Sequence, residues 1–299
     1  MRSEEISFYS EGAKIIGTLH PPDVGDQARA PVIVQGPGWL EKACSPISER
    51  FHESFVAGGY AVLQFDYRGF GKSEGEQGWI RPDDQIADII NALAFVETRQ
   101  DLDPARIGLF GSGGTGGGNA IYVAANDDRV KTVILDNAVA DGADWLRRMR
   151  RDYEWNEFRE RVNHDQRARV IENKGELVDP TDELMVSTPE RKAAGMPTFG
   201  RSIHLASAQY LQRYKPIDVV HRIAPRPLLI VCVANDPVIP EEHAWAIYER
   251  AGKPKRIIRQ VGVGHYEAYR ENHEAIAAEF IAWLDRYLVG KSIVVQADE

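Results

Sequence analysis

Short apolar segments alternate with amphipathic ones along most of the chain, and this alternation constrains the fold more than any other feature. Segments typical of buried strands lie at residues 31–35, 60–67, 106–111, 130–136, 227–234 and 256–261. Helical periodicity occurs between and after them, at residues 47–57, 82–98, 240–250 and 271–288, and residues 5–10 and 13–20 are expected to form a hairpin. Strands that alternate with helices predict an α/β fold, a mostly parallel sheet with helices on both faces.

Residues 141–215, called the cap segment below, interrupt this alternation. They are rich in charge, show no clear strand pattern and include WLRRMRRDYEWNEFRERV at residues 145–162, which we expect to form one long polar helix. We therefore predict a core of residues 1–140 and 216–290, a helical cap insertion at 141–215 and a C-terminal tail at 291–299.

Composition and motif spacing narrow the classes of partner. The formal net charge of −9 disfavours a nucleic acid, whose phosphates an acidic surface repels. Cys44 and Cys232 form no C-x-x-C pair and no histidines are spaced H-x-x-x-H, so we expect neither a metal nor another cofactor. The chain has no apolar run of about 20 residues and does not begin like a signal peptide. We expect a cytoplasmic protein that acts on a small molecule and not on a membrane, with a homodimer left open.

Residues 106–136, RIGLFGSGGTGGGNAIYVAANDDRVKTVILD, fit two chemistries. Gly111, Gly113 and Gly116 spell G-x-G-x-x-G, and Asp136 follows Gly116 by 20 residues, as in a dinucleotide-binding fingerprint. The same stretch fits the strand, turn and helix that present a hydrolase nucleophile. A dinucleotide fingerprint usually follows the first strand of its domain, whereas four strand-like segments precede this one. The hydrolase interpretation is therefore favoured over a Rossmann-type oxidoreductase.

Three further motifs follow expected strands: FDYRGFGKSEG at residues 65–75, ANDPVIP at 234–240 and GVGHYEAY at 262–269. With the glycine-rich turn, their order resembles the α/β-hydrolase family, most closely its branch of dienelactone hydrolases and acyl-peptidase-like esterases. The resemblance covers nearly the whole chain outside the cap segment and implies the order nucleophile, acid, histidine. It implies that His265 is the general base and that Asp236 orients it, with Asp136 as a fallback acid.

The glycine-rich turn departs from the family pattern at the nucleophile. Relatives carry G-x-S-x-G directly after the strand, whereas residues 111–118 read G-S-G-G-T-G-G-G. Counting forward from Arg106 puts the sharp turn, or elbow, at Gly113, and counting back from the strand at Val130 puts it at Gly114. Neither residue has a side chain that could attack a substrate. Three alternatives stay open: attack by Ser112, attack by Thr115, or attack by water that His265 activates.

Backbone amides are expected to bind the oxyanion. Gly113 and Gly114 would begin a helix, and amides at a helix N-terminus attract anions. A second donor is expected in the loop QGPGWLEK at residues 35–42. Because Pro37 has no N–H, that donor would be Gly38 or Trp39.

Six arginines gather in the expected cap helix, at positions 147, 148, 150, 151, 159 and 161. They could recognise a substrate carboxylate. They could also form surface pairs at i,i+4 spacing, such as Arg150 with Glu154 and Glu157 with Arg161. We favour the surface pairs, because charged helix faces are usually solvated.

Together these features predict a hydrolase of a small or medium acyl compound, either an ester or an activated carbon–carbon bond such as that of a β-diketone. The alternative is an altered hydrolase scaffold that binds a small molecule or acts as a lyase. The presence of both His265 and Asp236 favours the enzyme, because a protein that only binds a ligand needs no oriented base.

Overall fold

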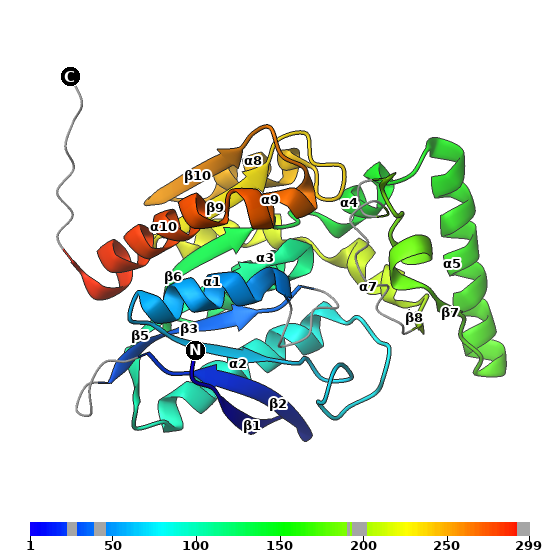
Figure 1. Cartoon of the computed structure of the whole chain (residues 1–299). Helices are drawn as coiled ribbons and strands as arrows, with labels where there is room; N and C mark the ends of the chain where they lie inside the picture. Colours follow the sequence, from blue (N-terminus) through cyan, green and yellow to red (C-terminus); the bar gives the residue numbers. More distant parts are fainter. Residues whose placement is uncertain (23–28, 39–45, 190–191, 193–201, 292–299) are drawn as a thin grey trace.

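The computed structural model describes residues 1–22, 29–38, 46–189, 192 and 202–291, and the account below concerns these residues. Its centre is an eight-stranded sheet in the order β1-β2-β4-β3-β5-β6-β9-β10 (Figure 1). Strand β2 runs antiparallel to both of its neighbours, while β4, β3, β5, β6, β9 and β10 pair in parallel. The predicted α/β fold with a mostly parallel sheet is confirmed.

The strands of this sheet agree with the expected apolar segments. Their bounds are β1 Glu4–Ser10, β2 Ala13–His20, β3 Ala30–Gly36, β4 Ala61–Phe65, β5 Leu102–Ser112, β6 Val130–Asp136, β9 Leu228–Val233 and β10 Lys255–Gln260. Strands β3, β4, β6 and β9 are buried on both faces, which explains why they appear in the sequence as unbroken apolar runs.

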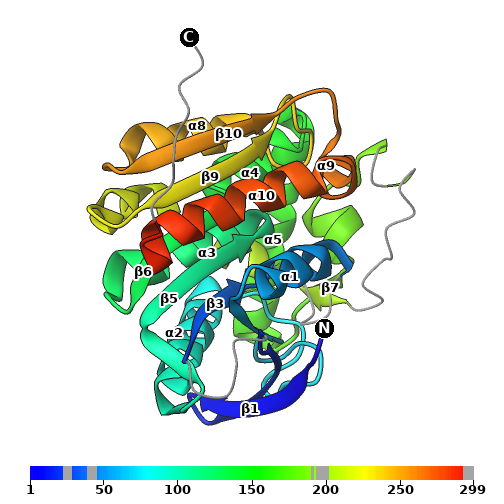
Figure 2. The ribbon, with the colours of Figure 1, turned by 60° about the vertical axis from the view of Figure 1, so that its left-hand side comes forward.

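Helices cover both faces of the sheet, as Figure 2 shows. One face packs against α1 (Pro46–Ala57), α9 (His265–Glu271) and α10 (His273–Leu284), and the other against α2 (Pro82–Thr98), α3 (Gly113–Asn126) and α8 (Glu241–Arg250). Strand β5 contributes to both layers, because Leu109 lies in one apolar cluster and Phe110 in the other. The Phe110 ring lies 5.4 to 5.9 Å from those of Phe51, Phe55 and Phe280, measured between centroids. This aromatic cluster fixes the strand just before the glycine-rich turn.

The C-terminal helical region begins earlier than its periodicity indicates. We expected one helix at residues 271–288, whereas α9 begins at His265 and α10 at His273, followed by the π-helix η4 (Asp285–Val289). The carboxylate of Glu267 accepts a hydrogen bond from the backbone N–H of Gly264, so the chain is capped as a helix from His265 onward. His265 is therefore held at a helix N-terminus rather than in a loop.

The cap segment lies beyond the end of the sheet to which the parallel strands point (Figure 1). Its elements are α4 (Gly142–Arg148), α5 (Asp152–Glu172), β7 (Leu177–Val178), the π-helix η1 (Pro180–Leu184), β8 (Ile203–His204) and α7 (Ser207–Arg213). The 3-10 helices η2 (Pro216–Asp218) and η3 (Val220–Ile223) lead back to the core. The short antiparallel pair β7–β8 was not predicted, because two-residue strands leave no periodic pattern.

The prediction of one long helix at residues 145–162 is wrong, because the chain bends between α4 and α5. Arg150 lies at the bend, only 8% exposed, and its guanidinium donates to the backbone carbonyls of Leu146, Glu183 and Leu184. A new helix then starts where the carboxylate of Glu154 caps the N–H of Arg151. The bend brings backbone carbonyls of η1 to the buried guanidinium, and these hydrogen bonds offset the cost of burying its charge.

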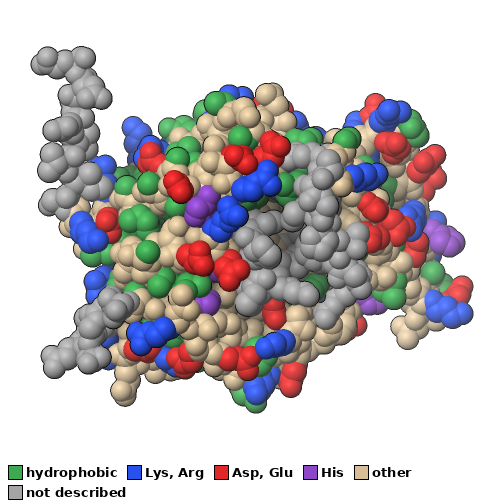
Figure 3. Space-filling model, in the orientation of Figure 1, with side chains coloured by type: hydrophobic (Ala, Val, Ile, Leu, Met, Phe, Trp, Pro, Cys, Tyr) green, Lys and Arg blue, Asp and Glu red, His purple; other side chains and the backbone are tan. Residues whose placement is uncertain are grey.

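The surface carries mixed charge. Figure 3 shows Asp and Glu side chains intermingled with Lys and Arg on one face of the molecule. Both edge strands bear charged residues, with Glu4 and Glu5 on β1 and Arg256 and Arg259 on β10, which disfavours pairing with a further strand. Within the described ranges, no helix is long and apolar enough to cross a membrane.

Candidate active site

His265 and Asp236 meet at the carboxyl end of the sheet although 29 residues separate them. The distance from His265 Nδ1 to Asp236 Oδ2 is 2.6 Å, and their side chains are only 7% and 0% exposed. The other oxygen, Oδ1, accepts the backbone N–H groups of Val238 and Ile239 at 2.7 and 3.0 Å. With Nδ1 donating to the carboxylate, Nε2 is the ring nitrogen that can take up a proton.

Two tyrosines lie against the His265 ring, and an asparagine bonds to one of them. The ring centroids of Tyr266 and Tyr269 lie 4.8 and 5.7 Å from that of His265, both nearly perpendicular to it. Asn137 donates through Nδ2 to the Tyr269 hydroxyl at 3.1 Å and to Asp136 Oδ1 at 3.0 Å. Asp136, the fallback acid, therefore bonds to Asn137, while His265 bonds to Asp236. Neither Asn137 nor Tyr269 was predicted from the sequence; the available signal was the i,i+4 spacing of His265 and Tyr269.

The elbow of the glycine-rich turn lies at Gly113. Ser112 ends β5 in extended conformation, with φ −97° and ψ 133°, and Gly113 follows with φ +67° as the first residue of α3. A positive φ at the junction of strand and helix is the strained conformation of a nucleophile elbow. Counting forward from Arg106 thus gives the position that the backbone adopts, and the residue there is a glycine.

Packing distinguishes Gly113 from the glycines around it. An added Cβ would lie 2.3 to 2.6 Å from its nearest neighbour at four positions: Gly111, Gly116, Gly117 and Gly118. At Gly114 it would lie 2.9 Å from Val139 Cγ2. At Gly113 the nearest atom of the described residues is the Cα of Gly38, at 3.6 Å, an ordinary van der Waals contact. Close packing therefore requires glycine or strongly favours it at the other positions, while the elbow has room for a side chain.

Ser112 and Thr115 flank the elbow. Alternation along β5 places the Ser112 side chain on the same face as Phe110, and the residue is 3% exposed. Thr115 lies in the first turn of α3, is fully buried, and its hydroxyl has no hydrogen-bond partner among the described residues. Their roles as nucleophile stay predictions.

The expected oxyanion donors lie on both sides of the elbow. Gly113 and Gly114 begin α3, and Gly38 approaches from the loop after β3. The hydroxyl of Tyr67 donates to the carbonyl of Pro37 in that loop at 3.1 Å. Trp39, the other predicted donor, lies outside the described residues, as does Cys44.

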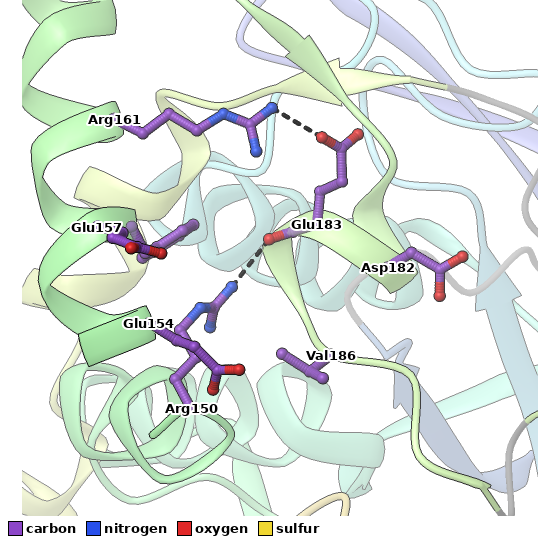
Figure 4. Close-up of a pocket in the computed structure, with 8 residues that line it drawn as sticks. Arg150, Glu154, Glu157, Arg161, Asp182, Glu183 and Val186 are labelled. Atoms are coloured by element: carbon purple, nitrogen blue, oxygen red, sulfur yellow. Dashed lines mark hydrogen bonds and ion pairs between the residues drawn. The ribbon is translucent and has the colours of Figure 1, made fainter. Parts of the chain in front are cut away.

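The cap segment contains a separate cavity of about 330 Å³ between α5 and η1 (Figure 4). Two arginines line it, but both are engaged: Arg150 by backbone carbonyls, and Arg161 by Glu176 and Glu183. The predicted pairs, Arg150 with Glu154 and Glu157 with Arg161, are not the ones formed. Burial lowers the pKa of the Arg150 guanidinium to about 10, still high enough for a positive charge at neutral pH. These arginines join parts of the cap segment, so they offer little to a substrate carboxylate.

The other groups that could take part in catalysis are the Cys232 thiol and possible metal ligands. Burial raises the pKa of the Cys232 thiol to about 12, so the thiolate is not populated at neutral pH. Within the part of the chain that the structure describes, no group of three or more His, Cys, Asp or Glu side chains could hold a metal ion.

The sheet order, the elbow at the end of a central strand and the bonded His–Asp pair define a protein of the α/β-hydrolase class. Residues 40–266 match the family model described as "Serine aminopeptidase, S33", so the chain belongs to this family of hydrolases. The family description refers to a serine, whereas the elbow residue of this chain is Gly113.

Similar proteins agree with this classification. An uncharacterized 31.7 kDa protein of the traX-finO intergenic region of Escherichia coli is 30% identical over 244 residues, covering 80% of this chain and 85% of that protein. Thiohydrolase aneE of Aspergillus aculeatus is 26% identical over 286 residues, covering 85% and 83% of the two chains. The crystal structure of the α/β hydrolase GrgF from Penicillium superposes with a TM-score of 0.82 at 21% identity, covering 97% of this chain and 100% of GrgF.

Proposed function

We propose that the protein hydrolyses an activated acyl compound by direct attack of water, without a covalent acyl-enzyme. The observation that carries the proposal is an intact His265–Asp236 pair beside an elbow whose residue is Gly113. The base is present and oriented, whereas the position from which a serine would attack carries only hydrogen. The room beside Gly113 suits a water molecule that attacks in place of a side-chain hydroxyl.

The reaction would begin when His265 Nε2 removes a proton from water as its oxygen bonds to the acyl carbon. The carbonyl oxygen becomes an oxyanion, which amides beside the elbow stabilise, and Asp236 stabilises the imidazolium. The intermediate then expels the leaving group, which takes the proton from His265. Water and R–CO–X thus become R–COOH and HX.

Direct attack by water restricts the substrate. Without an acyl-enzyme, water itself must attack the acyl carbon, and water is a weaker nucleophile than an activated serine. The substrate therefore needs a good leaving group, such as a thiolate, a phenolate, or the enolate released from a β-diketone. The name of the relative aneE, a thiohydrolase, supports this range of acyl compounds. We therefore infer an activated ester, a thioester or a β-diketone as substrate.

The test combines kinetics with labelling. Turnover of p-nitrophenyl esters, acyl thioesters and β-diketones is measured for the wild type and for Ser112→Ala, Thr115→Val, His265→Ala and Asp236→Asn. We expect the first two variants to keep activity within a few fold, and the last two to lose roughly 100-fold or more. A fluorophosphonate should leave the mass of the wild type unchanged. An adduct on Ser112 or Thr115, with activity lost in the matching variant, would establish a covalent nucleophile instead.

The glycine at the elbow also favours a second candidate, a small-molecule binding protein. In that case none of these compounds is turned over, and His265→Ala leaves the affinity for an acyl ligand unchanged. Turnover that depends on His265 excludes it.

A further inference from the structure

We propose that Tyr67 is a positioning residue that orients an oxyanion-binding amide of the active site, an inference that rests on the proposed function. Tyr67 follows β4 within the DYRG motif and is 1% exposed. Its hydroxyl donates to the carbonyl oxygen of Pro37 at 3.1 Å. Pro37 precedes Gly38, whose Cα lies 3.6 Å from the Cβ position of Gly113.

The geometry of the peptide bond turns this contact into a statement about Gly38. In a planar trans peptide, the C=O of one residue and the N–H of the next point in opposite directions. When Tyr67 holds the Pro37 carbonyl on its own side, the N–H of Gly38 must point to the other side. A fixed amide direction matters because an oxyanion donor is effective only when it is aimed before the charge develops.

A buried network gives the Tyr67 hydroxyl its direction. Asn119 Nδ2 lies 3.4 Å from the Tyr67 oxygen, as a donor, and 3.0 Å from Gln85 Oε1. Because Asn119 donates toward Tyr67, the single hydroxyl proton of Tyr67 is directed at Pro37. Gln85 and Asn119 are 2% and 0% exposed, so little water competes for these bonds.

Packing against α3 fixes the same loop from a second side. An added Cβ at Gly116 would lie 2.5 Å from the carbonyl oxygens of both Gly36 and Pro37. The end of β3 and the following peptide thus rest directly on the first turn of the elbow helix. The bond from Tyr67 adds a restraint on the rotation of the Pro37–Gly38 peptide about the chain axis.

The same network offers a matched control in Tyr214. Its hydroxyl lies 2.8 Å from Asn119 Oδ1 and 3.1 Å from the carbonyl oxygen of Thr115, two acceptors that share its single proton, and the residue is 4% exposed. Tyr214→Phe removes a buried hydroxyl from this network, as Tyr67→Phe does, but leaves the bond to Pro37 in place. A purely structural role for the hydroxyls predicts similar effects of the two variants.

The experiment measures kcat, KM, the pH profile and the melting temperature of both variants. We expect Tyr67→Phe to lower kcat roughly 10- to 100-fold, less than the loss of an entire oxyanion donor, with KM within about threefold. The pH profile should not move, because the contact between His265 and Asp236 is unchanged. Tyr214→Phe should keep kcat within about threefold despite a similar loss of melting temperature. Equal losses of kcat in the two variants, or a Tyr67→Phe effect confined to KM, would overturn the proposal.

A second measurement separates this inference from the proposed function. In the Gly113→Ser background, the rate of fluorophosphonate labelling also depends on the oxyanion-binding amides. Slower labelling with Tyr67→Phe but not with Tyr214→Phe supports the positioning role, even if the wild type turns over no acyl compound. Unchanged labelling with Tyr67→Phe would count against it, even if water-mediated hydrolysis is established.

Discussion

Gly113→Ser should install a nucleophile where the backbone is already shaped for one. Among the described residues, the new Cβ would contact only Gly38 Cα, at 3.6 Å, and none of them has to move. The cost is conformational, because a φ of +67° in the left-handed region costs an L-residue about 1–2 kcal/mol. Loss of glycine's freedom in the unfolded chain offsets this by roughly 0.4–1 kcal/mol. The variant should therefore unfold about 1 kcal/mol more easily, a fall of roughly 2–4 °C in Tm.

The assay for this variant is intact-protein mass after incubation with a fluorophosphonate, followed by peptide mapping. We expect one adduct per chain at position 113 and no adduct on the wild type. The adduct should disappear in the double variant Gly113→Ser/His265→Ala, since the new hydroxyl needs the base beside it. In a separate assay with a p-nitrophenyl ester, the variant should release one equivalent of p-nitrophenolate before steady state, and the wild type should show no such burst.

Two neighbouring glycines provide controls. Gly114→Ser adds a hydroxyl one residue further on, where the Cβ would lie 2.9 Å from Val139 Cγ2, and it should not be labelled. Gly117→Ser would put its Cβ 2.5 Å from that of Ala138 and should destabilise the protein by several times more than Gly113→Ser. A folded Gly113→Ser variant that stays unlabelled, or a wild type labelled at Ser112, would refute this assignment of the elbow.

Two further predictions concern stability. Burial lowers the pKa of His52 to about 3, and neither ring nitrogen has a partner among the described residues. Below about pH 6.5 the unfolded chain therefore binds a proton on His52 that the folded chain does not bind. As the pH falls further, the free energy of unfolding decreases by up to roughly 1.4 kcal/mol per pH unit. His52→Leu should flatten this slope in urea titrations between pH 7 and 5; an unchanged slope contradicts the assignment. Arg150→Met should cost about 3 kcal/mol by leaving the carbonyls of Leu146, Glu183 and Leu184 without their donor; a loss below about 1 kcal/mol would show that water replaces it.

Periodicity was a reliable guide where one physical requirement dominated. Strands β3, β4, β6 and β9 had to be apolar on both faces because helices cover both, and their apolar runs predicted them closely. It failed at the bend between α4 and α5, where the decisive contacts of Arg150 are with carbonyls more than 30 residues away. No local pattern of charges indicates such a distant partner, so the sequence did not distinguish the buried Arg150 from a solvated arginine.

The sequence by itself determined the order of the strands in the core, the family and the His265 and Asp236 candidates, because periodicity and motif order can be recognised without tertiary contacts. Only the tertiary structure decided which residue forms the elbow. Forward and backward counts disagreed between Gly113 and Gly114, since β5 ends and β6 begins where the sheet requires and not at a fixed number of residues. The positive φ of Gly113 and the 3.6 Å approach of Gly38 depend on strands β3 and β5 lying side by side. Contacts of that range are set by packing, so the position of the elbow could be determined only from the folded chain.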